Sequence, residues 1–282
     1  MPCFHPIAAF EQPGGRVRIG FDRGDGVPFR VPCGKCKGCL LERGRQWAVR
    51  CMHEASQYED NCFVTLTYDD EHLPCGGSLV LEDFQRFMRR LRKSIRPRKV
   101  RFFHAGEYGS QYGRPHYHAL LFGYDFADKV FQFDRGGFPV FRSAHLEALW
   151  TAGRSELGSV SFESAAYVAG YLVGTDRRPC VGLDADGVVG PLKREYATMS
   201  RRPGIGKAWF DKFGREVYHD DGVVVDGRLR KPPRFYDVAA AMEFPLEFEE
   251  VREARRRARR MDLPAAEAHC LSRLSLKRRD LE

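Results

Sequence analysis

The chain has 282 residues, 43% of them hydrophobic, which is enough to bury a core in one large domain or in a domain with an appendage. Its formal net charge of +8 and isoelectric point of about 9.1 favour a polyanionic partner. The composition excludes disordered and fibrous classes, no apolar run approaches the roughly 18 residues that span a bilayer, and the N-terminus lacks a signal-peptide pattern. We therefore expect a cytoplasmic protein with no membrane association.

The N-terminal part is rich in glycine and arginine over residues 11–32, which predicts loops or a short hairpin. Three cysteines then fall within seven residues: Cys33, Cys36 and Cys39. This density indicates reduced thiols or a metal cluster rather than a disulfide framework. Cys3 or His5 could supply a fourth ligand for structural Zn²⁺. The alternative is buried or surface thiols that hold no metal.

Apolar residues recur at helical spacing over 40–58, a β-branched and aromatic strand is expected over 62–68, and an amphipathic helix is expected over 81–95. The stretch from Phe84 to Gly106 contains no acidic residue. The polar face of the helix expected over 81–95 instead carries basic side chains, among them Arg86, Arg89, Arg90 and Lys93. We expect this face to track DNA phosphates; an ordinary solvated helix face is the alternative.

Two further strands are expected over 100–105 and 116–122, joined by a glycine-rich turn at 109–114. Period-two alternation places His116 and His118 on one face of the second strand. Glu107 ends the first strand where His116 begins the second, so two imidazoles and a carboxylate could hold a divalent cation. Two solvated or core histidines are the alternative. We also expect Arg114, just before the histidine pair, to contact DNA.

A helix is expected over 143–151 with Ser143 as its cap, and another over 164–173 with Gly174 beyond its end. The second helix carries Tyr167 and Tyr171 four residues apart, so both hydroxyls would leave one face. Paired core aromatics are the alternative. Beside a metal-bound phosphate, however, a phenolate becomes an accessible nucleophile. The metal ligands, tyrosines and basic helix together favour cleavage of a DNA phosphodiester by tyrosine.

Residues 176–231 predict only short strands and turns, and from residue 245 we expect two charged helices broken at Pro264. No GxxxxGK[ST] phosphate loop occurs, so no nucleotide cofactor is expected in this chain. The order strand, helix, strand, strand, helix predicts an α+β fold, with an antiparallel sheet covered by helices.

Three segments resemble, in order and spacing, the motifs of the HUH replication initiators: FVTLTY at 63–68, the block from Gly106 to Phe122, and YVAGY at 167–171. With VPCGKCKGC at 31–39 and QWAVR at 46–50, residues 1–175 look like the rolling-circle replication initiation protein of gokushovirus-type microviruses, which are single-stranded DNA bacteriophages.

The resemblance implies a ferredoxin-like or RRM-like core with a sheet of about five antiparallel strands. For the whole chain we expect a nuclease domain over 1–240, which includes the cysteine-rich N-terminal segment, followed by a basic helical tail over 241–282. The resemblance also implies a nickase dependent on Mg²⁺ or Mn²⁺ that cuts a single-stranded DNA origin and forms a 5′-phosphotyrosyl intermediate. Its metal ligands would be Glu107, His116 and His118, and its nucleophiles Tyr167 and Tyr171. Partners would be a helicase and a DNA polymerase of the bacterial host.

One departure from the family concerns the lysines that usually follow the second tyrosine. Here residues 172–175 read LVGT, so a phosphate-steadying role would fall to Arg177 or Arg178. Two other functions are compatible with parts of the sequence. One is a non-catalytic zinc-containing protein that binds single-stranded nucleic acid, and the other is a cupin-like metalloenzyme acting on a small molecule.

Overall fold

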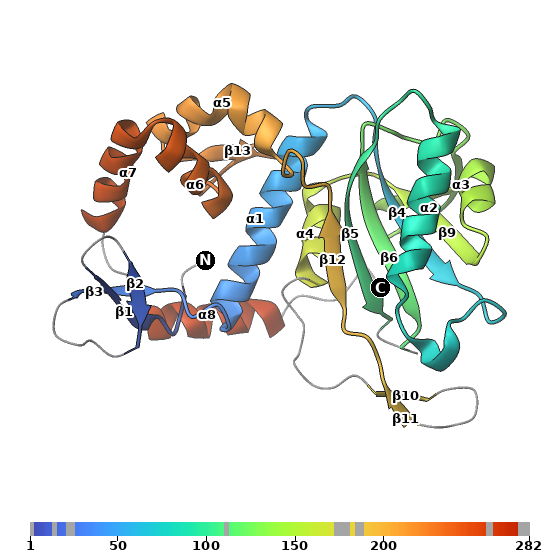
Figure 1. Ribbon diagram of the computed structural model, residues 1–282, viewed down its shortest axis with the longest axis horizontal. Coiled ribbons are helices and arrows are strands. Elements are labelled where there is room, and N and C mark those ends of the chain that lie inside the picture. Colours follow the sequence, from blue (N-terminus) through green and yellow to red (C-terminus); the bar gives the residue numbers. More distant parts are fainter. Residues whose placement is uncertain are drawn as a thin grey trace.

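The computed structural model describes residues 3–12, 16–20, 26–109, 113–171, 181–183, 189–257 and 262–275. A large sheet with helices on both faces lies on one side of the long helix α1 (Lys37–Ala55), and smaller helical and strand elements lie on the other (Figure 1). Within the described residues, no helix combines the length and the apolar character that crossing a membrane requires.

The central sheet has seven strands, every neighbouring pair antiparallel. In spatial order they are β12 (Tyr196–Met199), β5 (Arg101–Tyr108), β6 (Pro115–Phe122), β4 (Asn61–Tyr68), β9 (Gly153–Gly158), β8 (Phe138–Arg142) and β7 (Val130–Arg135). The expected α+β class is therefore confirmed, but the expected count of about five strands is too low. A distant short strand, β12, extends one edge of the sheet, and the β7–β8 hairpin extends the other.

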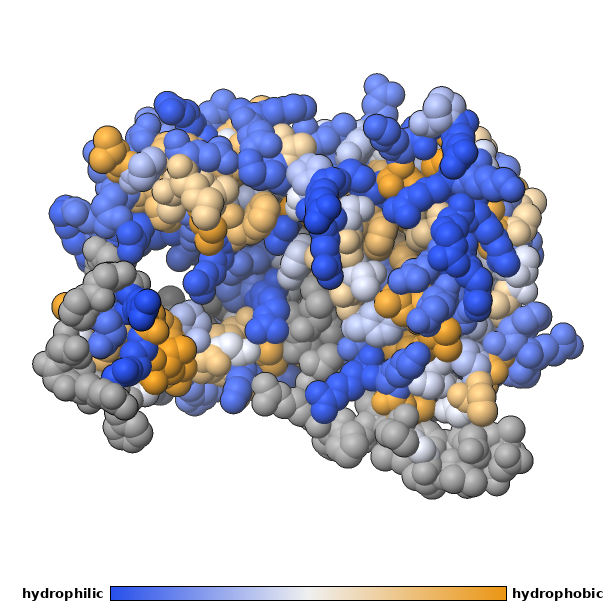
Figure 2. Space-filling view, viewed as in Figure 1, coloured by the Kyte–Doolittle hydropathy of each residue, from blue (hydrophilic) through white to orange (hydrophobic). Residues whose placement is uncertain are grey.

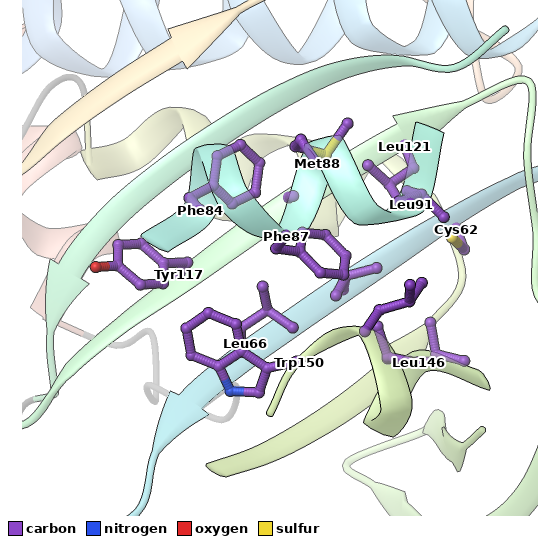
Figure 3. Packing of buried hydrophobic residues seen from close by; sticks show 14 of the residues in the cluster. Cys62, Leu66, Phe84, Phe87, Met88, Leu91, Tyr117, Leu121, Leu146 and Trp150 are labelled. Atoms are coloured by element: carbon purple, nitrogen blue, oxygen red, sulfur yellow. The ribbon is translucent and has the colours of Figure 1, made fainter. Parts of the chain in front are cut away.

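One face of the sheet is covered by α2 (Leu81–Ser94) and α3 (Ala144–Leu149). Figure 3 shows the apolar stripe of α2 directed at the sheet, with Phe87 near Leu66 and Leu91 near Leu121. These side chains are at most 3% exposed. The helix forms here because its apolar residues recur at i, i+3, i+4 and i+7, which places them on one side.

The opposite face is only partly covered. Helices α1 and α4 (Phe162–Tyr171) pack over β5 and β6, where Ala48 and Ala165 approach Leu120 and Phe103. The predicted alternation along residues 116–122 is confirmed, because Leu120 faces this core whereas Tyr117 and Leu121 face the α2 core.

Helix α4 begins two residues earlier than expected. Ser161 and Ser164 cap it reciprocally: the Ser164 N–H donates to Ser161 Oγ at 3.1 Å, and the Ser161 N–H donates to Ser164 Oγ at 2.8 Å. Ser143 caps α3 as predicted by accepting from the Leu146 N–H. The expected end of α4 near Gly174 lies outside the described residues.

A second group of elements follows β12: α5 (Lys207–His219), the hairpin of β13 (Val223–Val225) and β14 (Arg228–Arg230), α6 (Arg234–Glu243) and α7 (Pro245–Arg257). Their apolar side chains share a core around Phe210 and Tyr236. The sequence did not predict α5, because Gly214 interrupts its pattern and glycine and arginine dominate the surrounding residues. The expected domain boundary at residue 240 lies within α6, and the division into two domains stays a prediction.

The remaining elements are two small sheets and the helix α8. A three-stranded sheet of β1 (Ile7–Glu11), β2 (Val17–Ile19) and β3 (Val27–Val31) forms where loops or a short hairpin were expected. The two helices expected from residue 245 are present as α7 and α8 (Leu263–Ser275). Pro264 lies in the first turn of α8, where proline is tolerated, rather than between the two helices. A small sheet pairs β10 (Val181–Leu183) with β11 (Val189–Pro191).

Candidate active site and metal centres

The strand register brings the predicted metal ligands together. Glu107 on β5 lies directly opposite His116 on β6, so both side chains leave the same face. Glu107 Oε1 lies 2.5 Å from His116 Nε2 and 2.7 Å from His118 Nε2. One ligand atom from each of the three residues falls within 4.8 Å of the others. We call these three residues the Glu–His–His cluster.

Glu107 and His118 are buried and His116 is partly exposed, and contacts among the three residues shift their pKa values. Glu107 is 1% exposed. Burial alone would raise the pKa of Glu107, but hydrogen bonds and charge from His116 and His118 outweigh it and lower this pKa to about 2. Burial lowers the pKa of His118, whereas the contact with Glu107 raises that of His116 against the effect of its own burial.

The far side of each imidazole is held by a second contact. His116 Nδ1 donates to the Arg114 carbonyl at 3.0 Å, and His118 Nδ1 is 3.0 Å from Thr65 Oγ1. Both Nε2 atoms are thereby turned toward Glu107. Metal-ligating histidines are usually oriented in this way by a partner on the second ring nitrogen. Thr65 is a positioning residue to which the sequence alone assigned no role.

Tyr167 reaches the cluster from α4. Its hydroxyl donates to Glu107 Oε1 at 3.3 Å, and its ring lies edge-on to His118 with centroids 5.1 Å apart. Small residues on α4, such as Ala165 and Ala169, are fully buried and let the helix approach the sheet closely. Tyr171 is the last residue of α4, one turn further on. The Tyr171 side chain, Arg177 and Arg178 are outside the part of the chain that the structure describes.

The basic side chain of Arg154, which the sequence did not single out, lies on this face of the sheet. Thr67 pairs with His116 on one side and with Arg154 on the other, so Arg154 stands in the same row as His116 and Glu107. Two strand spacings put its Cα roughly 10 Å from that of His116. Arg154 is exposed. No local pattern could have revealed it, because its placement depends on the pairing of β4 with β9.

The basic residues of α2 do not join this site. Their helix packs on the opposite face of the sheet, and Figure 2 shows hydrophilic side chains covering its outer surface. Arg86 pairs with Asp83, and Arg90 donates to the Leu149 carbonyl at 3.1 Å. A DNA-binding role for Arg86, Arg89, Arg90 and Lys93 stays a prediction. Arg114 donates to the Tyr68 carbonyl at 3.0 Å and pairs with Asp70.

A second candidate metal centre lies at the start of α1. The sulfur atoms of Cys3, Cys33, Cys36 and Cys39 lie within 4.8 Å of one another. His5 does not join them, because its Nε2 contacts Glu267 Oε1 of α8 at 2.9 Å. Backbone N–H groups donate to sulfur: that of Cys33 to Cys3 at 3.2 Å, and that of Phe4 to Cys36 at 3.4 Å. We call this group the four-cysteine cluster.

The thiols of this cluster perturb one another. Burial raises the pKa of Cys36, but hydrogen bonds from backbone N–H groups and neighbouring thiols outweigh it and lower this pKa to about 6. Burial and the neighbouring thiols raise the pKa of Cys39 to about 12. Four thiolates at this range repel one another unless a cation compensates their charge.

Fold and site together define an α+β protein with a three-ligand candidate metal centre beside a tyrosine. The family described as "Replication-associated protein ORF2/G2P" matches residues 61–176, the segment that contains this centre. Replication-associated protein VP4 of Bdellovibrio phage phiMH2K is 34% identical over 248 residues, covering 84% of this chain and 76% of that protein. The chain belongs to this family of replication-associated proteins from microvirus-type phages.

Two other relatives support the same family assignment. Replication-associated protein ORF2 of Spiroplasma virus 4 is 32% identical over 231 residues, covering 77% of this chain and 70% of that protein. Replication-associated protein ORF4 of Chlamydia phage 1 is 30% identical over 217 residues, covering 74% of this chain and 53% of that protein. No solved structure matches the chain.

Proposed function

We propose that this protein initiates rolling-circle replication of a phage genome by nicking single-stranded DNA with a tyrosine and later rejoining the strand. The observation that carries the proposal is the contact of the Tyr167 hydroxyl with Glu107 at the Glu–His–His cluster. A candidate nucleophile from one helix and candidate metal ligands from two strands meet at one point, as a phosphoryl-transfer site requires.

The cluster fits Mg²⁺ or Mn²⁺. Glu107 Oε2 is buried and has no hydrogen-bond partner among the described residues, which is costly unless something else compensates its charge. Two imidazole nitrogens and a carboxylate leave further coordination positions open. When bound there, the cation would polarise the scissile phosphate and offset charge in the transition state.

The protein's own groups then do the following. The hydrogen bond to Glu107 and the contact with His118 orient the Tyr167 hydroxyl toward the cluster. Its oxygen attacks the phosphorus, a new P–O bond forms to tyrosine, and the bond to the 3′ oxygen breaks. Tyr167 loses its hydroxyl proton, the leaving 3′ oxygen takes up one proton and departs as a hydroxyl, and the 5′ phosphate stays on the enzyme. Because the phosphotyrosyl bond conserves the energy of the phosphodiester, the released 3′ hydroxyl can later reverse the step.

Tyr171 would serve as the second nucleophile, cutting the regenerated junction while the first linkage is resolved. Its position one helical turn after Tyr167 supports this alternation. A host polymerase would extend the 3′ hydroxyl. Because the sequence has no nucleotide-binding loop, a host helicase would open the duplex, in the bacterial cytoplasm.

We further propose that the four-cysteine cluster binds structural Zn²⁺. Four sulfur ligands and N–H donors directed at the sulfurs support a closed thiolate site. Such a site would join the chain near Cys3 to the first turn of α1.

The decisive experiment uses random-sequence single-stranded oligonucleotides labelled at either end, incubated with the full chain and Mg²⁺ or Mn²⁺. A 3′ label should migrate with the protein in SDS, whereas a 5′ label should be released on a shorter fragment. EDTA should abolish both signals, and the Tyr167→Phe, Tyr171→Phe double variant should form no adduct.

Tyr124→Phe is the matched control, since Tyr124 belongs to the core on the opposite face and its hydroxyl contacts His145 at 3.2 Å. It should form adducts normally. An adduct that persists in the double tyrosine variant, or that forms equally well in EDTA, would refute the proposed chemistry.

A further inference from the structure

A pocket opens directly beside the Glu–His–His cluster, over the half of the sheet that α1 and α4 leave uncovered. Its cavity volume is about 90 Å³, and it opens to solvent. Strands β4 and β9 form its floor, the β7–β8 hairpin forms one wall, and the start of α4 forms the other. Both His118 and Tyr167 line it.

We propose that this pocket, the base pocket, binds one nucleobase of single-stranded DNA next to the phosphate that Tyr167 attacks. The inference rests on the proposed function and adds a subsite to it. A group held in the base pocket touches the same His118 and Tyr167 side chains that face the candidate metal centre, so a base there belongs to a nucleotide adjoining the scissile bond.

Aromatic side chains suited to a flat ring stand on two sides of the pocket. Phe63 on its floor is nearly parallel to His118, with ring centroids 5.4 Å apart and an interplanar angle of 12°. Phe138 on the hairpin wall is 37% exposed, so part of its ring is free to contact a ligand. Stacking on aromatic rings is the main sequence-tolerant way in which proteins hold single-stranded bases.

A polar pair offers contacts to the edge of a base. Arg135 lies opposite Phe138 in the hairpin and is therefore on the same face. Its guanidinium contacts both carboxylate oxygens of Glu156, at 3.1 and 3.3 Å. The side chains are about one-third exposed. The pair thus presents donors and acceptors together at the pocket wall, which is the requirement for reading the hydrogen-bonding edge of a nucleobase.

The hairpin provides its own control. Phe131 pairs with Phe141, which pairs in turn with Leu157 in the core of the opposite face. Phe131 is 57% exposed but points away from the base pocket. Phe138→Ala and Phe131→Ala therefore remove equal, exposed rings from two sides of the same hairpin.

The test measures binding of the full chain to random single-stranded 12-mers without divalent cation, so that no cleavage step enters. Phe138→Ala should weaken binding roughly fivefold or more. It should leave binding of an abasic deoxyribose-phosphate 12-mer unchanged, and Phe131→Ala should change neither. Among homopolymers of dA, dC and dT, Glu156→Gln should change which one the protein binds most tightly.

A second readout locates the base directly. With 5-iododeoxyuridine in the random 12-mers, ultraviolet cross-links should map to peptides containing Phe63 or Phe138. Equal losses in Phe138→Ala and Phe131→Ala, a loss on abasic DNA as large as on normal DNA, or cross-links confined to other surfaces would overturn the proposal. Thermal melting of both variants shows that the comparison concerns folded protein.

The two proposals fail separately. Cross-links in the base pocket without any tyrosine adduct would leave the pocket standing and refute the nickase. Adduct formation with no base-dependent effect of Phe138→Ala would support the nickase and refute the base pocket.

Discussion

The two candidate metal centres are built from different parts of the fold and with different chemistry. The Glu–His–His cluster offers one oxygen and two nitrogen ligands, fixed by the pairing of β5 with β6. The four-cysteine cluster offers four sulfurs, three of them around the first turn of α1 and one from near the N-terminus. Three ligands leave room for substrate, whereas four thiolates complete a tetrahedral shell.

The surroundings of the two candidate metal centres differ as well. Glu107 and His118 are almost fully buried, yet they border the base pocket and the Tyr167 hydroxyl. The cysteines are half-buried, and within the described part of the chain their sulfurs hydrogen-bond only to backbone N–H groups and to one another. These differences support the roles proposed for the two centres: chemistry at the first, and holding two chain segments together at the second. Changes at each should therefore affect different measurements.

The largest expected effect is on cleavage, from His118→Ala. Losing one of three ligands should reduce metal-dependent adduct formation about a thousandfold or more, equivalent to about 4 kcal/mol of transition-state stabilisation. The measurement is the rate of adduct formation at saturating Mn²⁺. His72→Ala, at a half-exposed histidine paired with Asp69, should retain the wild-type rate. Unchanged cleavage by His118→Ala would remove the centre from the mechanism.

The counterpart at the other centre is Cys39→Ser, which should affect stability rather than chemistry. The purified protein should lose one zinc per chain, and the free energy of unfolding should fall by about 4 kcal/mol if free zinc is near 1,000 times its Kd. Elemental analysis measures the zinc content, and chemical denaturation measures the free energy of unfolding. Cys75→Ser, at an exposed cysteine outside the cluster, should change neither. Wild-type protein that contains no zinc would contradict this prediction.

A smaller effect is expected from Thr65→Val, which removes the hydrogen-bond partner of His118 Nδ1 while keeping the side-chain shape. Affinity for Mn²⁺ should fall about 10- to 100-fold, because an unrestrained imidazole is a poorer ligand. Calorimetric titration of Mn²⁺ measures it. Thr67→Val, on the same face of the same strand, is the matched control; an equal loss there would show that the strand, and not the hydrogen bond, is responsible.

The smallest effect concerns DNA binding. Arg154→Ala should weaken single-stranded DNA binding a few-fold and reduce the salt-dependence slope by about one, as expected for one lost phosphate contact. Arg89→Ala, on α2 across the sheet, belongs in the same titration. A reduced slope for Arg89→Ala would show that DNA also reaches the far face. An unchanged slope for Arg154→Ala would exclude Arg154 from phosphate contact.

Much of the site was predictable because its residues are close in sequence. Glu107 and the histidines are separated by one tight turn, so an antiparallel pair of strands had to bring them together. Period-two alternation then settled which residues share their face. The i, i+4 spacing placed both tyrosines on one helix. That Tyr167 lies beside the cluster was a hypothesis from the combination of motifs and from the family resemblance, because no local pattern fixes how α4 packs on the sheet.

The rest depended on contacts between distant segments. Thr65 orients His118 only because β4 pairs with β6, and Arg154 and the base pocket exist only because β9 and the β7–β8 hairpin extend the sheet beyond β4. The structure likewise brings Cys3 rather than His5 to the other thiols, while His5 contacts Glu267 of α8.

By itself, then, the sequence determined the ligand types, their local spacing and the net positive charge, because these depend on residue identity and on backbone periods of 2 and 3.6. Only the tertiary structure decided which face of the sheet stays open, which distant strand supports each ligand, and that the basic helix lies opposite the tyrosine. Those outcomes depend on long-range strand pairing and helix packing, whose free energy is shared among many residues and leaves no signature in any short segment.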